Sequence, residues 1–386
     1  MDTSLIRAEI DLKAIAHNVS ELRRITQPNA RLMAVVKADG YGHGAVEVAR
    51  CALQNGAERL GVARIDEGIA LRTAGIQAPI LIFGYTLPEL AAELLEYDLT
   101  QTVYTAASAR ALSRTAVAIE EKIKVHLKVD TGMGRLGLLT QNFRSRHSDE
   151  MINTAAADET LSIAGLQGLE LEGVFTHFAT ADSADKRYAE KQLDLFLNYL
   201  DRMRAAGLNP AVRHAANSAA LIDMPQSHLD MVRPGIAIYG LYPSDEVDKK
   251  RVPLRPAMAM RTRIIHLKKV PAGFHISYGI TYKTQKPTTI ATVPVGYADG
   301  LNRLLSSRGQ MLVRGKRVPI VGRICMDLTM LDVGNIENVQ VGDEAVIFGQ
   351  QDNETITVDE MASALNTINY EIVSTITARV PRVYLR

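Results

Sequence analysis

The spacing of apolar residues changes character near residue 243. Before it, short apolar runs alternate with stretches of helical spacing, such as Leu193, Phe196, Leu197 and Leu200. Repeated strand–helix units imply a parallel sheet. Eight strands are predicted: Arg31–Ala38, Arg59–Ala63, Pro79–Phe83, Thr100–Thr105, Lys124–Asp130, Leu169–Phe178, Val212–Ala216 and Asp230–Tyr239. Eight units favour a closed (β/α)8 barrel, and a doubly wound open sheet is the alternative. The seventh strand and region 140–165 have the weakest pattern.

A helix is predicted ahead of the first strand, because Ile15, Val19, Leu22 and Ile25 have helical spacing and Asp11 can cap it. After Tyr242-Pro243 a charged stretch resembles a linker. Short strands divided by Gly, Pro and Asp follow: Met260–Val270, Thr288–Val295, Gln310–Val313, Arg317–Ile324, Asp327–Val333 and Glu344–Gly349. We therefore expect a barrel domain over residues 1–243 and a mainly β domain over residues 244–386.

Composition excludes several functions. The chain has 386 residues, of which 47% are hydrophobic and 23% charged, as in soluble globular proteins. Its 44 basic and 43 acidic residues give no electrostatic reason to bind nucleic acid or an anionic membrane. No apolar run approaches the ~20 residues of a membrane span. The N-terminus carries charges where a signal peptide is apolar, so we expect a cytoplasmic protein. Cys51 and Cys325 are too few for a disulfide framework or a zinc site, and no metal site is predicted.

Lys37 is the first candidate for chemistry. It ends an apolar run and precedes the glycine-rich stretch Ala38–Gly44, which is typical of a strand-to-helix loop. A lysine at the mouth of a strand loses part of its hydration, which lowers its pKa. A neutral amine can attack a carbonyl and form a Schiff base. A surface lysine in a loop is the alternative.

The segment Asp130–Gly137 has more than one interpretation. Gly132, Gly134 and Gly137 fit a dinucleotide-binding pattern, but no convincing helix follows them. Asp-Thr-Gly also occurs in aspartic proteases, which need a second such carboxylate. We prefer Arg135 as the functional group, because a guanidinium on a flexible loop can bind a carboxylate through two hydrogen bonds.

Polar residues gather at the carboxyl ends of the predicted strands, where barrel enzymes keep their active sites. They are Lys37, Lys128, Asp130, Arg135, His177, Asn217, Ser218 and Arg233. His177 and Arg233, expected on neighbouring strands, could pair. In the second domain Tyr278, Tyr297, Asp327 and Tyr370 adjoin glycines or strand ends, although each could be an ordinary strand-end residue.

Together these motifs resemble those of alanine racemases, over nearly the whole chain and in the family's order. The matching segments are Ala34–Gly44, His126–Gly137, Thr176–Phe178, Ala216–Ala219, Met231–Gly235, Ser277–Gly279, Gly296–Gly300 and Arg323–Asp327. The resemblance implies a barrel followed by a β domain and dependence on pyridoxal 5'-phosphate. It also implies a head-to-tail homodimer whose active sites are each built from both subunits.

The resemblance also implies a role for each residue. Lys37 would carry the cofactor as a Schiff base, and Arg233, backed by His177, would hydrogen-bond its pyridine nitrogen. Tyr278 would be the second catalytic base, supplied by the other subunit, and Lys128 would be carbamylated beside Arg135. The remaining cofactor-binding residues would be Tyr41, Asn217, Ser218, Gly235, Ile236 and Tyr370. The remaining substrate-side residues would be Arg135, Tyr297, Met326 and Asp327.

Racemisation explains this choice of residue types. One base cannot remove the α-proton on one face and return a proton on the other, so Lys37 and Tyr278 would act as a pair. The implied activity interconverts L-alanine and D-alanine, with D-alanine serving peptidoglycan synthesis, although a catabolic enzyme would have the same motifs. The alternatives are a broader-specificity amino-acid racemase, a barrel-type amino-acid decarboxylase and a cofactor-binding protein without turnover. A decarboxylase is disfavoured because it would place an acid, not Arg233, at the pyridine nitrogen.

Overall fold

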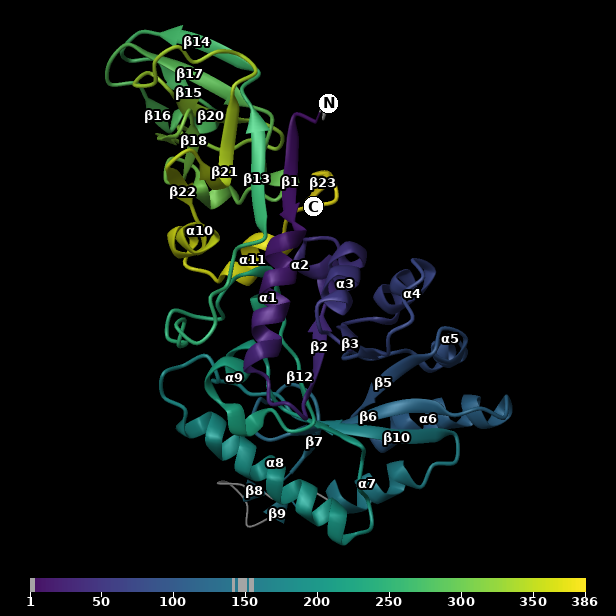
Figure 1. The fold of residues 1–386 in the computed structure, drawn as a ribbon. Helices are drawn as coiled ribbons and strands as arrows, with labels where there is room; N and C mark the ends of the chain where they lie inside the picture. Colours follow the sequence, from purple (N-terminus) through teal and green to yellow (C-terminus); the bar gives the residue numbers. More distant parts are fainter. Residues whose placement is uncertain (1–3, 141–142, 145–150, 153–155) are drawn as a thin grey trace. The chain divides into compact units, whose positions relative to one another are not determined.

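The computed structural model describes residues 4–140, 143–144, 151–152 and 156–386 (Figure 1). The chain separates into two compact units. One unit comprises Ala14–Gly40 and Ala45–Arg255. The other comprises the segment ending at Lys13, the loop Tyr41–Gly44 and Pro256–Arg386. The predicted region 140–165 lies partly outside the described residues.

The first unit is built on a closed barrel of parallel strands. Each strand pairs with the next around the circuit, and β12 pairs with β2 to close it. The strands are β2 (Arg31–Val35), β3 (Arg59–Val62), β4 (Ile80–Ile82), β5 (Leu99–Val103), β6 (Ile123–Asp130), β10 (Leu169–Phe175), β11 (Val212–His214) and β12 (Met231–Val232). The direct pairing of β6 with β10 leaves no open sheet edge there, so the barrel prediction is confirmed over the open-sheet alternative.

Helices alternate with the strands along the chain (Figure 1). They are α1 (Leu12–Ile25), α3 (Ala45–Gln54), α4 (Ile65–Thr73), α5 (Ala91–Glu96), α6 (Ala106–Ala118), α7 (Ala156–Ala164), α8 (Arg187–Ala205) and α9 (Ser218–Asp223), and the segment labelled α2 (Lys37–Tyr41) is a turn with left-handed backbone angles. Short 3-10 turns are η1 (Pro88–Leu90), η2 (Pro225–Ser227) and η3 (Ile236–Tyr239), and short strands are β7 (Leu138–Leu139), β8 (Phe143–Arg144) and β9 (Met151–Ile152). Apolar periodicity explains the burial: α8 buries Leu193, Phe196, Leu200 and Met203.

Several strands are shorter than predicted. The eighth strand ends at Val232, and the last four residues of the predicted strand, Ile236–Tyr239, form the turn η3. Pro234 lacks the N–H that a ladder needs, which explains the early end. The first barrel strand ends at Val35 because the chain then enters a turn with left-handed backbone angles.

The second unit is mainly β, as predicted. Its largest sheet has the order β19-β18-β21-β13-β1-β23, a second has the order β14-β17-β20, and β15 pairs with β16. The strands are β1 (Ile6–Asp11), β13 (Met258–Arg263), β14 (His266–Val270), β15 (His275–Ile276), β16 (Tyr282–Lys283), β17 (Thr288–Val293), β18 (Gln310–Val313), β19 (Lys316–Pro319), β20 (Thr329–Asp332), β21 (Glu344–Gln351), β22 (Glu354–Ile356) and β23 (Arg382–Leu385). Its helices are α10 (Val358–Leu365) and α11 (Asn369–Ser374), with turns η4 (Tyr278–Ile280), η5 (Tyr297–Asp299) and η6 (Arg303–Leu305).

The N-terminal strand β1 was not predicted. It pairs antiparallel with β13, placing Ala8 opposite Met260, and parallel with β23. Buried and partly exposed residues alternate only briefly along this strand, and two of the partly exposed ones, Arg7 and Glu9, are charged, so the sequence pattern is weak. These two residues form ion pairs with each other and with Arg261 and Glu344 on neighbouring strands. The strand Ile6–Asp11 therefore belongs to the β unit.

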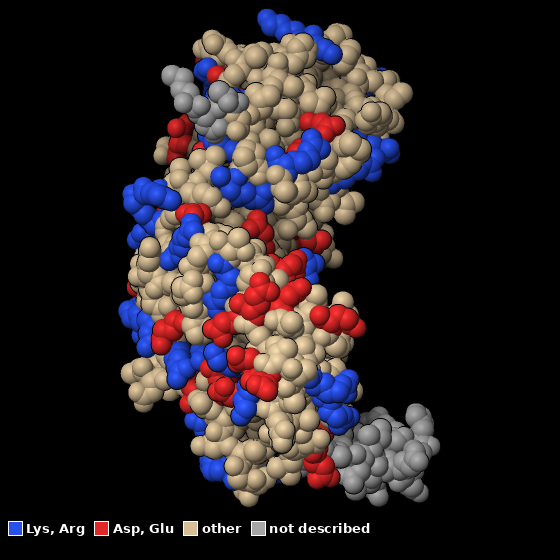
Figure 2. Space-filling view, turned by 90° about the vertical axis from the view of Figure 1, so that its right-hand side faces the viewer, with Lys and Arg blue, Asp and Glu red and all other residues tan. Residues whose placement is uncertain are grey.

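The surface carries both signs of charge. Figure 2 shows basic and acidic side chains on the same face of the molecule. Within the described part of the chain, every helix is too short or too polar to span a bilayer.

Candidate active site

Lys37 lies two residues beyond the end of β2, at the start of an unusual turn. Ala38, Asp39 and Tyr41 have φ angles of 52°, 51° and 52°, in the left-handed region, and Gly40 has 60°. Such angles cost L-residues about 1–2 kcal/mol each. Strain of this kind persists only where other contacts fix the backbone.

Glu67 of α4 supplies part of that fixation. Its Oε1 accepts a hydrogen bond from the Ala38 N–H at 2.6 Å, and its Oε2 accepts one from the Ala63 N–H at 2.6 Å. Asp39 accepts a further bond from the Ala45 N–H at 2.9 Å. These bonds tie the turn after Lys37 to the loop after β3.

The electrostatic surroundings of Lys37 favour its neutral amine. Burial lowers the pKa of Lys37, the Arg135 guanidinium lowers it further, and Glu67 opposes this shift. A neutral amine is the form that acts as nucleophile or base. The sequence-based interpretation of Lys37 is compatible with this geometry.

Asp130 organises the loop that carries Arg135. Its Oδ1 accepts the N–H groups of Gly132 and Gly134 at 2.8 and 3.2 Å, and its Oδ2 accepts the Arg135 N–H at 3.2 Å. Gly132 and Gly134 have positive φ angles, which allow the tight loop. Asp130 therefore shapes the loop, and the glycines serve a turn and not a dinucleotide.

Lys128 points into the barrel from the same strand as Asp130. Its residue is 4% exposed, and its amine lies 5.4 Å from the centre of the Phe175 ring. Burial lowers the pKa of Lys128 to about 8, and Arg135 and Arg233 contribute to that shift. At pH 7 roughly a tenth of this amine is therefore uncharged, far more than for a lysine with an ordinary pKa near 10.4.

Arg233 is buried at the end of β12. Its Nη2 donates to the carbonyls of Thr176 and Ala215 at 2.9 and 3.0 Å and lies 3.3 Å from Nδ1 of His177. The predicted pairing of His177 with Arg233 is therefore confirmed. They are not on neighbouring strands, because β11 lies between β10 and β12.

Burial and the nearby guanidinium of Arg135 lower the pKa of Arg233 to about 9, so it stays charged at neutral pH. Burial and Arg233 hold the pKa of His177 well below its ordinary value. His177 is therefore a neutral acceptor for a charged donor.

Ser218, Asn217 and Gly235 meet where β11 and β12 end. The Ser218 hydroxyl accepts the Gly235 N–H at 2.9 Å and the Ala237 N–H at 3.4 Å. Asn217 caps α9 by accepting the Ala220 N–H at 3.0 Å. Ile236 follows Gly235 at the start of η3. Hydroxyl and backbone N–H groups are thus gathered beside the cationic residues.

The β unit holds the other predicted residues around one loop. Ser277 donates to the Arg323 carbonyl at 2.6 Å, and the Tyr297 and Ala298 N–H groups donate to the carbonyls of Cys325 and Met326 at 3.1 Å each. Tyr278, Tyr297, Met326 and Asp327 are therefore close in the fold. Asp327 pairs with Arg379 at 2.8 Å.

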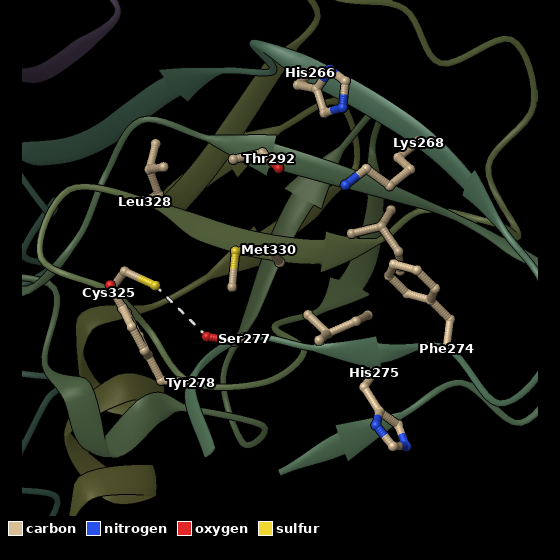
Figure 3. A pocket seen from close by; sticks show the side chains of 12 residues that line it. His266, Lys268, Phe274, His275, Ser277, Tyr278, Thr292, Cys325, Leu328 and Met330 are labelled. Atoms are coloured by element: carbon tan, nitrogen blue, oxygen red, sulfur yellow. Dashed lines mark hydrogen bonds between the residues drawn. The ribbon is translucent and has the colours of Figure 1, made fainter. Parts of the chain in front are cut away.

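Tyr278 stands at the edge of a pocket of about 470 Å³ (Figure 3). It is 70% exposed, and its neighbours Ser277 and Gly279 have φ angles of 65° and 71°. This left-handed backbone projects the phenol from a tight turn.

Tyr41 belongs to the β unit together with Tyr370. Their ring centres are 6.1 Å apart. Gly42 leaves no room for a side chain, because a Cβ there would lie 2.1 Å from the Val373 carbonyl oxygen. Arg382 also donates to the Gly42 carbonyl at 2.9 Å. The segment Tyr41–Gly44 is therefore held in place within the β unit.

Sequence reasoning missed four residues inside the barrel: Arg59, His126, Glu172 and His214. They form hydrogen bonds with one another and with Arg233. One signal was available, since His126 alternates with Lys128 and Asp130 on β6 and so faces the same side.

The donor set fits pyridoxal phosphate. Like-charge repulsion from Arg135 lowers the pKa values of Lys37, Lys128 and Arg233, and Arg233 and Lys37 lower that of Lys128 further. An anionic group would relieve this repulsion, and a carbonyl group could form a Schiff base with the Lys37 amine. These two requirements describe an aldehyde that carries a phosphate.

Comparisons with known proteins agree with the fold. The family model for the alanine racemase N-terminal domain matches residues 10–243, and that for the C-terminal domain matches residues 257–384. An alanine racemase from Desulfosudis oleivorans is 62% identical over 377 residues, 98% of this chain and 96% of that protein.

Solved structures give the same result. Alanine racemase from Clostridium difficile 630 has a TM-score of 0.92 and 40% identity, covering 100% of this chain and 97% of that one. Alanine racemase from Bacillus anthracis, with bound L-Ala-P, has a TM-score of 0.90 and 39% identity, covering 100% and 96%. The enzyme class is that of isomerases. The chain belongs to the alanine racemase family, which is pyridoxal-phosphate-dependent, and the predicted family and fold are confirmed.

Proposed function

We propose that this protein binds pyridoxal phosphate at Lys37 and interconverts L-alanine and D-alanine by a two-base mechanism. The observation that carries the proposal is the half-buried Lys37 at the barrel mouth, with the pKa of its amine lowered by partial burial and by Arg135. The 62% identity to an alanine racemase supports the choice of substrate.

Lys37 and Tyr278 are the proposed bases. Pyridoxal phosphate, when bound, supplies an electron sink that makes the α-hydrogen of an attached amino acid acidic. The Lys37 amine then takes or returns the proton on one face, and the Tyr278 phenol does so on the other. Each group handles one enantiomer because a single base cannot reach both faces.

Arg233 and His177 fit the pyridine side of the cofactor. A guanidinium only donates, and at a pKa of about 9 it keeps its protons at neutral pH. It would hydrogen-bond a ring nitrogen without transferring a proton to it. Such a contact leaves a weaker electron sink, which suits rapid proton exchange and discourages transamination.

The other predicted residues would hold the phosphate and the substrate. Ser218, Gly235 and Ile236 supply hydroxyl and backbone groups for phosphate, with Asn217 holding the local turn and Tyr41 and Tyr370 as further proposed contacts. Arg135 suits a substrate carboxylate. Tyr297, Met326 and Asp327 would limit the substrate side chain. The Bacillus anthracis relative with bound L-Ala-P supports a small substrate.

We further propose that Lys128 is carbamylated. Carbamylation needs a neutral amine, and the pKa of about 8 provides one. The carbamate would be an anion between Arg135 and Arg233, where an ammonium is disfavoured. Asp130 already accepts three backbone N–H groups, so it serves poorly as a partner for a bare ammonium.

The proposed assembly is a head-to-tail homodimer that acts in the cytoplasm, where D-alanine is made for peptidoglycan. In that assembly Tyr278 would reach the partner subunit's cofactor. Its 70% exposure in the single chain is compatible with this role.

A racemisation assay tests the proposal. The purified protein, loaded with pyridoxal phosphate, is incubated with a panel of L-amino acids, and circular dichroism is followed to equilibrium. The signal of L-alanine should decay to zero, and larger amino acids should react at least ~10-fold more slowly, because one extra methylene is worth about 10–200-fold in a fitted pocket. Equal rates across the panel would instead indicate a broad-specificity racemase. Lys37→Ala protein should lose both turnover and the borohydride-reducible link to the cofactor.

A further inference from the structure

A chain of hydrogen bonds crosses the barrel interior and ends at Arg233. Nη1 of Arg233 lies 2.8 Å from Nδ1 of His214, and Nε2 of His214 lies 2.8 Å from Nδ1 of His126. Nε2 of His126 lies 3.0 Å from Oε2 of Glu172. Both histidines are fully buried. The chain therefore links a carboxylate on one side of the barrel to the guanidinium at its mouth.

The donors fix the direction of every bond. A guanidinium can only donate, so Nδ1 of His214 accepts and its hydrogen sits on Nε2. That hydrogen is donated to His126, whose own hydrogen then sits on Nε2 and points at Glu172. Burial lowers the pKa of both histidines, so both are neutral. Each donor in the chain thus points toward Glu172.

Local backbone structure is adapted to this arrangement. The register between β10 and β6 shifts between Leu171 and Gly173, which makes Glu172 the extra residue of a β-bulge. Bulges redirect a side chain that regular alternation would place elsewhere. A Cβ on Gly173 would lie 2.6 Å from the His126 ring, so only glycine leaves space for that ring.

Phe175 holds the other end of the chain. Its ring stacks on His214, with centres 4.7 Å apart and planes 7° apart. The guanidinium of Arg233 lies 5.3 Å from the centre of the same ring. Stacking on one rigid ring restricts the rotation of both side chains.

Glu172 remains ionised at its end. Burial raises its pKa, but hydrogen bonds from His126 and Arg59 outweigh burial and hold the pKa well below its usual range. Arg59 Nη1 donates to Oε2 at 3.0 Å. The hydrogen-bond partners of Arg233 are histidine nitrogens and carbonyl oxygens. The carboxylate of Glu172 is therefore connected to Arg233 through the hydrogen bonds of His126 and His214.

We infer that Glu172 is a positioning residue for Arg233, supplying a remote counter-charge and a fixed direction through His126 and His214. This inference rests on the proposed function, in which Arg233 contacts the cofactor. A polarised imidazole accepts a stronger hydrogen bond than an isolated one. This relay, the hydrogen-bonded chain Glu172–His126–His214–Arg233, would keep the guanidinium charged and oriented toward the cofactor, although Glu172 itself would touch neither cofactor nor substrate.

Three variants test the inference. Glu172→Gln keeps the shape but removes the charge. His126→Phe keeps a ring over Gly173 and breaks the relay while leaving the Arg59–Glu172 pair in place, so it decides the question if Glu172→Gln does not fold. Glu170→Gln, on the exposed side of the same strand, is the matched control.

The first readout needs no cofactor. In protein labelled with 15N-histidine, NMR should find His126 and His214 as neutral Nε2–H tautomers. Glu172→Gln should shift the ring nitrogens of both, including His214, which does not touch Glu172. The second readout is kinetic. Glu172→Gln and His126→Phe should each lower kcat for alanine about 10-fold, within the range for coupled residues of one network, and change KM less than about 2-fold. Glu170→Gln should match the wild type throughout.

The inference is overturned if folded Glu172→Gln or His126→Phe protein keeps wild-type kcat, or if the His214 signals do not move in Glu172→Gln. A loss of thermal stability with neither change would mark the network as structural only. Failure of the wild-type protein to racemise alanine would instead refute the proposed function, while the cofactor-free NMR result would still decide whether the relay exists.

Discussion

Lys128 is a lysine whose surroundings disfavour its charge. In the folded barrel its pKa is about 8, against about 10.4 in an unfolded chain. Between these values the unfolded chain binds the extra proton, so stability falls as pH drops from about 10 to 8. Below pH 8 the loss is complete. The difference in unfolding free energy between wild type and Lys128→Met should therefore change by about 1.4 kcal/mol per pH unit in that window.

Urea unfolding of cofactor-free protein in carbonate-free buffer measures this slope. Lys124→Met is the control, since Lys124 is an exposed residue of the same strand paired with Asp98. A wild-type curve parallel to that of Lys128→Met from pH 8 to 10 would mean that Lys128 keeps an ordinary pKa.

Carbamylation of Lys128 can be observed directly. In 13C-bicarbonate at neutral pH, wild-type protein should show a protein-bound carbamate resonance by 13C NMR. The resonance should be absent from Lys128→Ala and present in Lys124→Ala. Activity of Lys128→Ala should be reduced, because Arg135 loses an anionic partner. A spectrum without the resonance, or electron density for a bare amine, would refute the modification.

The left-handed turn after Lys37 depends on an anchor from a neighbouring helix. Glu67 accepts backbone N–H groups from both Ala38 and Ala63. In Glu67→Gln, one amide oxygen cannot accept both, and the amide NH2 faces a donor. We expect a loss of about 1 kcal/mol in stability, the net value of one hydrogen bond, because Glu67 is half-buried and Ala38 is exposed.

Asp66→Asn is the matched control, because Asp66 is exposed and pairs with the exposed side chain of Arg64. Chemical unfolding measures stability, and acylation of cofactor-free protein measures Lys37 reactivity. Reactivity should change in Glu67→Gln alone. Equal behaviour of the two variants would show that the turn does not need Glu67.

Much of the architecture was predictable from periodicity. Buried strands such as β6 have apolar runs with regular alternation, and α8 has a clear apolar face, so their existence followed from the sequence. Strand ends were less predictable. Pro234 explains the early end of β12. The turn at Ala38–Tyr41 could not be predicted, because its residues have positive φ angles, which L-residues rarely adopt.

The residues of the candidate site were also predictable only in part. Residues at strand ends, such as Lys37 and Arg233, could be placed because parallel strands gather their carboxyl ends at one rim. Glu67 and Glu172 could not, since Glu67 acts from a helix through its neighbours' backbone and Glu172 depends on a bulge. Bulges have no period in sequence, so the relay to Arg233 required three-dimensional structure.

The two proposed bases lie on different units of the chain, Lys37 on the barrel unit and Tyr278 on the β unit. If each active site takes Lys37 from one subunit and Tyr278 from the other, inactive Lys37→Ala and Tyr278→Phe proteins should complement each other. A hybrid dimer would contain one site with both changes and one with neither. About a quarter of wild-type activity should return at random equal mixing, because half the dimers are hybrids with one intact site.

Subunit exchange must be verified by mixing differently tagged proteins and isolating the hybrid. Each variant mixed with wild type serves as the control for nonspecific loss. An isolated hybrid with no activity would mean that both bases come from one subunit.

The two-base mechanism is tested most directly by proton exchange in D2O. Loaded wild-type protein should replace the α-hydrogen of both L-alanine and D-alanine with deuterium while optical activity decays to zero. Tyr278→Phe should lower turnover by ~10²–10⁴-fold, the range for a lost general base, and should slow exchange from one enantiomer much more than from the other. Exchange from both enantiomers at near wild-type rates in Tyr278→Phe would contradict the account.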